Sequence, residues 1–244
     1  MAAKASCRSH IRWMNCQPQS PTYCWQMDAK LPGCVLFDLD GTLAHTLPDI
    51  AEAVRQTVCR QRPPPDDTVA TWIGHGVQRL VERALAGKID APEDPPGLEA
   101  ALDAFGTFYA AHACEQSAPF PGALTLLRQL RDSGRKTGCV TNKGRYFTIP
   151  MLEAFELATL LDVVVCGDDL PQRKPDPAPL FHALDLLGEK DSVYIGDSRA
   201  DFDAAANAKI PFIGVSFGYD HAAPLSQIPG IHLLDSFADL ARLL

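Results

Sequence analysis

Two aspartates that follow a short apolar run are the residues best suited to chemistry in this chain. Residues 34–37 are apolar, Asp38 and Asp40 come next, and Gly41 opens a turn. In extended backbone, side chains two positions apart point the same way, so both carboxylates can enter one pocket. Close like charges repel, which argues for a bound cation between them. Mg²⁺ suits a site made of oxygen ligands, and we expect Mg²⁺ as the cofactor.

Three more groups of polar residues each come after an apolar run or just before a helix. Thr141 and Asn142 offer a hydroxyl and backbone N–H groups that can hold phosphate oxygens at a helix entry. Lys174 places a cation in a proline-rich turn, and Asp197 and Asp201 add two carboxylates. A carboxylate can attack phosphorus when cations screen the repulsion, so these residue types together fit phosphoryl transfer.

The elements that must position these residues alternate between strands and helices. Strands are expected at 34–37, 137–140, 163–166, 192–195, 212–215 and 231–234. Helices are expected at 124–131, 147–155, 177–187, 201–208 and from 237 onward. Such alternation predicts an α/β fold with a Rossmann-like, doubly wound parallel sheet, which collects the strand ends at one edge.

A long stretch after the first strand carries helical signals and no strand signal. Helices are expected at 46–60, at 68–85 with a break at residues 74–76, and at 98–113. We therefore predict an all-helical cap domain inserted after the first strand. The expected division is a core of residues 33–46 and 119–244, a cap of residues 47–118, and an N-terminal extension of residues 1–32. We expect that extension to be disordered; a start that is not native is the alternative.

Composition limits the partners. The formal net charge is -8 and the pI is near 5.3, which gives no basic surface for nucleic acid or an anionic membrane. No apolar run is long enough to suggest a membrane span. The 8 cysteines contain no CxxC pair and several lie in apolar runs, which favours reduced thiols and a cytoplasmic location.

The motifs resemble those of the haloacid dehalogenase superfamily of phosphohydrolases. The four motifs of that superfamily read here as Asp38-Leu39-Asp40-Gly41-Thr42, Thr141, Lys174, and Gly196-Asp197 with Asp201. Within the superfamily the chain is most similar to the phosphoglycolate phosphatases. That narrower likeness rests on Trp72-Ile73-Gly74-His75-Gly76, Val81-Glu82-Arg83-Ala84-Leu85, Thr141-Asn142-Lys143, Gly167-Asp168-Asp169-Leu170-Pro171 and Gly218-Tyr219.

The resemblance implies a role for each core motif. Asp38 would be the nucleophile that forms an aspartyl-phosphate, and Asp40 would act as general acid and then as general base. Thr141 and Lys174 would neutralise the transferring phosphoryl group. The implied magnesium ligands are Asp38, the backbone carbonyl of Asp40, and Asp197, with Asp201 nearby or behind them.

The insert is expected to contact the substrate. Gly74 and Gly76 could allow close approach of the backbone to a ligand, although a simple helix break is the alternative. His75 and Arg79 are candidates to meet a substrate carboxylate. The other expected substrate-binding residues are Thr42 and Asn142. Lys143 and Arg199 could be either surface charges or part of the rim of the site.

One residue departs from the superfamily pattern. His45 stands where many relatives have an aspartate, which removes a negative charge near the expected hinge of the cap. The leading hypothesis is a magnesium-dependent phosphatase of a small phosphorylated metabolite, with 2-phosphoglycolate as the expected substrate, acting as a monomer or homodimer. A phosphosugar mutase, a broad-specificity phosphatase and a non-catalytic phosphate-ligand sensor are the alternatives.

Overall fold

A computed structural model describes residues 31–219 and 224–242. The extension expected to be disordered, residues 1–32, lies outside the described residues except for its last two. Within the described ranges, none of the helices combines the length and the apolar character needed to cross a bilayer.

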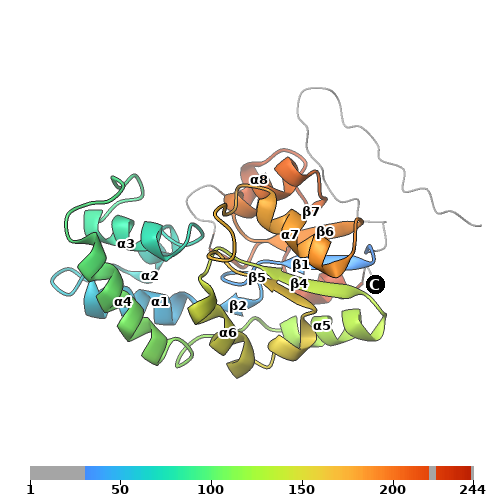
Figure 1. Cartoon of the computed structure of the whole chain (residues 1–244), viewed down its shortest axis with the longest axis horizontal. Helices are drawn as coiled ribbons and strands as arrows, with labels where there is room; N and C mark the ends of the chain where they lie inside the picture. The colour runs from blue at the N-terminus through green and yellow to red at the C-terminus, as the bar shows by residue number, and fades with distance from the viewer. Residues whose placement is uncertain (1–30, 220–223, 243–244) are drawn as a thin grey trace, which may run out of the picture.

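A parallel sheet forms the centre of the larger part of the molecule (Figure 1). Its strands lie in the order β5-β4-β1-β6-β7-β8, and every neighbouring pair is parallel. The strand bounds are β1 Cys34–Phe37, β4 Lys136–Val140, β5 Val163–Val165, β6 Ser192–Gly196, β7 Phe212–Val215 and β8 Leu233–Leu234. The strand order reverses beside β1, and such switch points are where open α/β sheets place their ligands.

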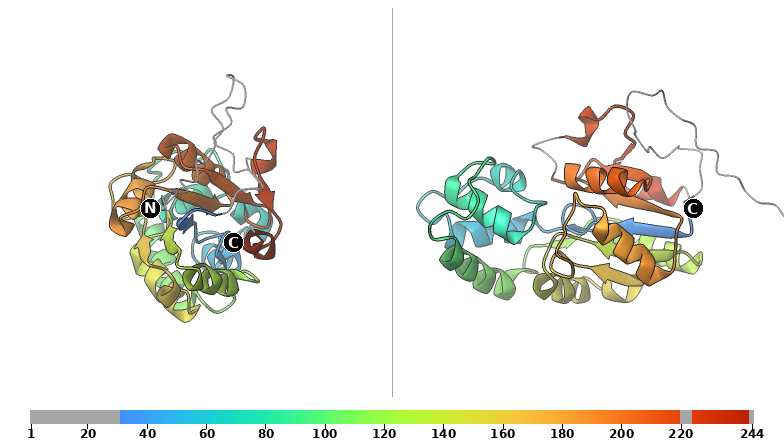
Figure 2. Two further views of the ribbon diagram at one scale, coloured as in Figure 1. Left: turned by 90° about the vertical axis from the view of Figure 1, so that its right-hand side faces the viewer. Right: turned by 45° about the horizontal axis from the view of Figure 1, so that its top comes forward.

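Helices cover both faces of this sheet, as the side view in Figure 2 also shows. Those helices and the short 3₁₀ turns are α5 Ala123–Asp132, α6 Arg145–Ala154, η1 Ala158–Leu160, α7 Ala178–Leu187, α8 Arg199–Ala208, η2 Leu225–Gln227 and α9 Phe237–Ala241. Strand β1 alternates between two apolar clusters: Val35 and Phe37 join the cluster containing α5 and α9, whereas Cys34 and Leu36 join the one containing α7 and α8. The α/β doubly wound fold predicted from the sequence is confirmed.

Helices α1 to α4 lie together at one end of the molecule, beyond the edge of the sheet where the strands end (Figure 1). Their bounds are α1 Leu47–Thr57, α2 Asp66–Ala70, α3 Val77–Ala86 and α4 Leu98–His112. The helical signal at 68–85 therefore corresponds to two helices separated by residues 71–76. The boundaries of a separate cap domain and its closing motion stay predictions.

A two-stranded ladder that the sequence did not predict joins this helical insert to the sheet. Strands β2 Ala44–His45 and β3 Ala118–Pro119 pair in antiparallel fashion, and Phe120 N donates to the carbonyl of Leu43 at 3.0 Å. Strands of two residues are too short to produce a periodic sequence signal. The ladder brings the two ends of the insert to the same place.

Candidate active site

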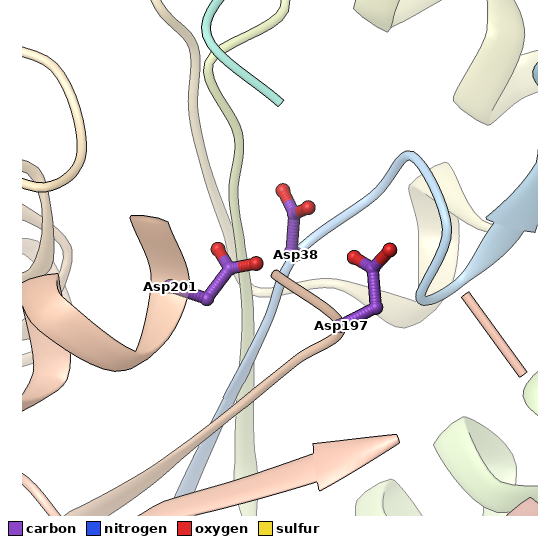
Figure 3. Close-up of side chains that lie close together, drawn as sticks. All are labelled: Asp38, Asp197 and Asp201. Carbon is purple, nitrogen blue, oxygen red and sulfur yellow. The ribbon is translucent and has the colours of Figure 1, made fainter. Parts of the chain in front are cut away.

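Three buried aspartates converge where β1 and β6 end (Figure 3). One carboxylate oxygen from each of Asp38, Asp197 and Asp201 lies within 4.8 Å of the others. Asp38 follows β1, and its N–H donates to the carbonyl of Ile195 at 2.9 Å, so its backbone is fixed by the neighbouring strand. Asp201 lies in the first turn of α8, where its Oδ2 accepts from both the N and Oγ of Ser198 in a capping box.

Lys174 supplies a positive charge to this cluster. Its Nζ lies 2.7 Å from Asp38 Oδ1, 2.7 Å from Asp201 Oδ1 and 2.8 Å from Tyr194 Oη. Burial raises the pKa of Asp38 to about 7, with Lys174 opposing that rise. Burial, together with Asp201 and Asp38, also raises the pKa of Asp197 well above its usual value. One ammonium therefore does not neutralise three carboxylates.

The cluster fits a divalent cation in its charge and in its ligand atoms. When all three carboxyl groups are ionised they carry two more negative charges than Lys174 balances, and all three candidate ligands are oxygens, as Mg²⁺ requires. The side chain of Asp197 is held in place on both oxygens: Thr42 Oγ1 donates to Oδ1 at 3.1 Å, and Tyr219 N donates to Oδ2 at 2.7 Å. Thr42, which we expected to contact substrate, thus contacts a candidate metal ligand.

Asp40 is paired with a lysine and not with the metal cluster. Lys143 Nζ lies 3.0 and 3.3 Å from the two carboxylate oxygens of Asp40 and 2.8 Å from Tyr109 Oη. Burial alone would lower the pKa of Lys143, but Asp40 and Tyr109 hold that pKa above its usual value. The side chain of Asp40 is 13% exposed, so it remains accessible from the cavity described below.

The residues after β4 connect the site to the insert. Thr141 continues the sheet pairing, because its N–H donates to the carbonyl of Val165 at 3.0 Å. Asn142 fixes the turn that carries Lys174: it donates to the Lys174 carbonyl at 2.9 Å and accepts from the Lys174 N–H at 3.0 Å. The amide of Asn142 also donates to the carbonyl of Gly74 in the insert, at 2.9 Å.

A small cavity lies between the strand ends and the insert. Its volume is about 50 Å³ for the centres of water-sized molecules, which is room for a few waters or a small ligand. The sheet side contributes Asp38, Asp40, Thr141, Asn142, Lys143 and Lys174. The side chains that the insert contributes are Ile50, Ile73, Val77, Leu80, Phe105 and Tyr109. The backbone of Gly74 and Gly76 lines it as well.

Three of the expected substrate-binding residues do not line this cavity: Thr42, His75 and Arg79. His75 is exposed, and its Nδ1 lies 3.4 Å from Arg83 Nη1. Arg79 is paired with Glu82 at 2.8 Å and donates to the carbonyl of Ala91 at 2.8 Å. An arginine held in this way does not reach the ligand space of this structure, so a substrate role for either residue stays a prediction.

Two tyrosines that contact the lysines of the site, Tyr194 and Tyr109, were not predicted from the sequence. Tyr194 lies in the middle of the apolar strand β6 and is fully buried, and its hydroxyl lies between Lys174 and Asp201. A tyrosine in a buried strand needs a polar partner, and that signal was available in the sequence. Tyr109 lies on α4, whose apolar pattern predicts that this tyrosine is simply a core residue. The sequence therefore did not indicate that its hydroxyl lies at the site.

The fold and these strand-end motifs define a class of hydrolase. The sequence profile of the haloacid dehalogenase-like hydrolases matches residues 35–215, and the chain belongs to that family. This confirms the resemblance drawn from the motifs, and with it the prediction that the chain is an enzyme.

Named relatives extend over most of the chain. A phosphoglycolate phosphatase of Thiobacillus denitrificans is 37% identical over 211 residues, which cover 85% of this chain and 93% of that protein. One from Pseudomonas putida is 40% identical over 200 residues, covering 80% and 73%. The crystal structure of a predicted phosphoglycolate phosphatase from Haemophilus somnus has a TM-score of 0.78 at 28% identity and covers 93% of this chain and 99% of that one.

Proposed function

We propose that this chain is a magnesium-dependent phosphomonoester hydrolase and that 2-phosphoglycolate is its substrate, which it converts to glycolate and phosphate. The observation that carries the proposal is the contact of Lys174 Nζ with Asp38 and Asp201, at 2.7 Å each, beside a small cavity. A buried carboxylate with a cation on one oxygen suits attack on an anionic phosphoryl group. The names of the relatives support this choice of substrate.

The chemistry proceeds in two half-reactions. An Asp38 oxygen attacks phosphorus, the bond from phosphorus to the substrate oxygen breaks, and an aspartyl-phosphate forms. Asp40 gives its proton to the leaving oxygen. It then takes a proton from a water that attacks the phosphorus, which releases phosphate and restores Asp38. Thr141 and Lys174 bind the phosphoryl oxygens in both steps.

Asp38, Asp197, the Asp40 carbonyl and Asp201 are the residues that would hold Mg²⁺, with Asp201 as a direct ligand or behind the others. When bound, the cation would neutralise charge on the phosphoryl group. The insert, acting as a cap, would exclude water around the reacting atoms and reopen for release.

We place this enzyme in the cytoplasm, acting on a small metabolite as a monomer or homodimer. The free state of the cysteines within the described residues, which are Cys34, Cys59, Cys114, Cys139 and Cys166, supports a reducing location.

A second candidate is a phosphatase of broader specificity, or a phosphosugar mutase, built on the same core. The observation that favours it is the apolar character of the insert side of the cavity, where Ile73, Val77 and Leu80 lie. Such a wall provides no obvious partner for a carboxylate. A mutase would transfer the phosphoryl group to a second sugar hydroxyl in preference to water.

The test is an assay of phosphate release from a panel of phosphomonoesters, with Mg²⁺ present or removed by a chelator. We expect 2-phosphoglycolate to have the highest kcat/KM and activity to require the metal. Asp38→Asn should abolish turnover. Asp185→Asn makes the same chemical change at an exposed position of α7 and should leave turnover intact. Equal turnover by wild type and Asp38→Asn would refute the mechanism, and binding of phosphate esters without any hydrolysis would favour a sensor.

A further inference from the structure

The cavity brings together only a small number of charges. Among the described residues that line it, the basic ones are Lys143 and Lys174. Lys174 is shared between two carboxylates, Asp38 and Asp201, and lies where the phosphoryl group would bind. A substrate with a second anionic group needs another cation, because an unpaired charge in a buried site is costly and the nearby aspartates repel it.

Lys143 has the properties that such a cation needs. It is 8% exposed, lines the cavity, and balances a single carboxylate, that of Asp40. Its Nζ also donates to Tyr109 Oη at 2.8 Å. A tyrosine hydroxyl has one hydrogen of its own to give, and within the described residues no acceptor receives the hydrogen of Tyr109. The hydroxyl thus offers a free donor to an anion, and the ammonium, whose contacts are with Asp40 and Tyr109, offers its positive charge beside it.

The two cations are close enough for a short substrate. Lys174 is held by Asp38 and Lys143 by Asp40. Both lysines also line the same cavity, which has a volume of only about 50 Å³ for the centres of water-sized molecules. A substrate with few atoms between its phosphate and its second anion can therefore reach both.

We infer that Lys143, assisted by the Tyr109 hydroxyl, binds the second anionic group of the substrate and gives the enzyme its preference for small phosphorylated acids. This inference rests on the proposed phosphatase function and deepens it. It assigns recognition of the carboxylate to a cation on the sheet side of the cavity, Lys143, which also positions Asp40, and to a hydroxyl that the insert contributes. Arg79 and His75 are excluded from this role in the arrangement seen here, because both are engaged outside the cavity.

The experiment compares two substrates that differ only in the second group: 2-phosphoglycolate and 2-hydroxyethyl phosphate, in which an uncharged hydroxymethyl group replaces the carboxylate. The quantity measured is the ratio of their kcat/KM values, because any effect of Lys143 on Asp40 applies to both substrates and cancels. Lys143→Met should lower this ratio by roughly tenfold to a hundredfold, which is the range for loss of a hydrogen bond to a charged group. Tyr109→Phe should lower it by about threefold to tenfold.

Matched variants make the result decisive. Lys143→Arg keeps the charge and should retain more of the ratio than Lys143→Met, and it provides a second folded variant if the methionine protein is unstable. Lys88→Met makes the same change at an exposed position of the insert and should leave the ratio unaltered. Equal losses on both substrates in Lys143→Met would overturn the inference, as would a fall of the ratio in Arg79→Met instead. Absence of phosphate release from any phosphomonoester by the wild type would instead refute the proposed function.

Discussion

Asn142 and Gly74 join the sheet to the helical insert through one hydrogen bond, in which Asn142 Nδ2 lies 2.9 Å from the carbonyl oxygen of Gly74. The same side chain makes two hydrogen bonds to the backbone of Lys174. Asn142 thus holds both the turn that carries Lys174 and the insert in register with β4. We therefore expect Asn142 to couple the position of the insert to the geometry of the candidate site.

Asn142→Ala should therefore reduce catalysis. All three hydrogen bonds are lost, and the Lys174 backbone is left without its partners, so we expect kcat/KM to fall by roughly tenfold or more and the free energy of unfolding by about 1–3 kcal/mol. Steady-state kinetics and urea denaturation measure the two effects. Asn207→Ala removes a side-chain hydrogen bond of 3.1 Å to the neighbouring Pro175 carbonyl from an exposed position, and its kcat/KM should stay within about twofold of wild type. A fully active Asn142→Ala enzyme would contradict this role.

Gly41→Ala should weaken binding of Mg²⁺. A Cβ at Gly41 would lie 2.2 Å from Asp197 Oδ2, so that carboxylate must move. We expect the Mg²⁺ concentration for half-maximal activity to rise roughly tenfold, the lower end of the range for residues that orient metal ligands. The measurement is a Mg²⁺ titration after treatment with a chelator.

Gly188→Ala is the control that separates the effect of the contact with Asp197 from the effect of backbone strain. Gly188 also has a positive φ, of 69° against 87° for Gly41, but nothing lies within 4 Å of its Cβ position. Both variants should lose about 1 kcal/mol of stability from the left-handed backbone. Only Gly41→Ala should change the Mg²⁺ requirement, and an equal requirement in the two proteins would show that the packing against Asp197 is unimportant.

Strands β1 and β7 of the central sheet were predictable because each is a compact apolar run. Residues 34–37 and 212–215 were predicted as strands and are β1 and β7 with the same bounds. Runs of this kind bury both faces of a parallel strand, so the signal comes from local composition and needs no knowledge of distant residues. The strand-end aspartates then followed from where each run stops.

The substrate side of the site was less predictable because its contacts are between residues far apart in the chain. Lys143 and Asp40 are separated by 103 positions, and nothing local to either residue indicates their pairing. Arg79 is the opposite case. Glu82 follows it at the i,i+3 spacing of a helical ion pair, and this local signal could have indicated that the arginine has a partner on its own helix.

Tyr219→Phe should destabilise the connection between the loop that follows β7 and the insert. The Tyr219 hydroxyl accepts hydrogen bonds from Thr46 N at 2.7 Å and Leu47 N at 3.1 Å, at the start of α1. Phenylalanine leaves these buried N–H groups without an acceptor, so the free energy of unfolding should fall by about 1–3 kcal/mol in urea denaturation. Tyr146→Phe removes a hydroxyl from a side chain that is 71% exposed and should change stability by less than about 0.5 kcal/mol. Equal stabilities of the two variants would disprove this prediction.

His45 should make the stability of this connection depend on pH. Its Nδ1 lies 2.8 Å from Tyr219 Oη. The tyrosine oxygen already accepts from two N–H groups, so its single hydrogen is directed to His45, whose Nδ1 must be unprotonated to accept it. Burial lowers the pKa of His45, with Asp66 opposing this weakly, which also favours the neutral ring.

The sign of the effect follows from that lowered pKa. The unfolded chain has a histidine pKa of about 6.5 and takes up a proton before the folded protein does. The contribution of His45 to stability is therefore complete above about pH 6.5 and decreases as the pH falls below that value. His45→Gln keeps an acceptor but cannot titrate. Its free energy of unfolding relative to wild type, measured by urea denaturation, should therefore rise as the pH is lowered from 7.5 to 5.5. A stability difference between His45→Gln and wild type that does not change over this pH range would show that folding does not shift the pKa of His45.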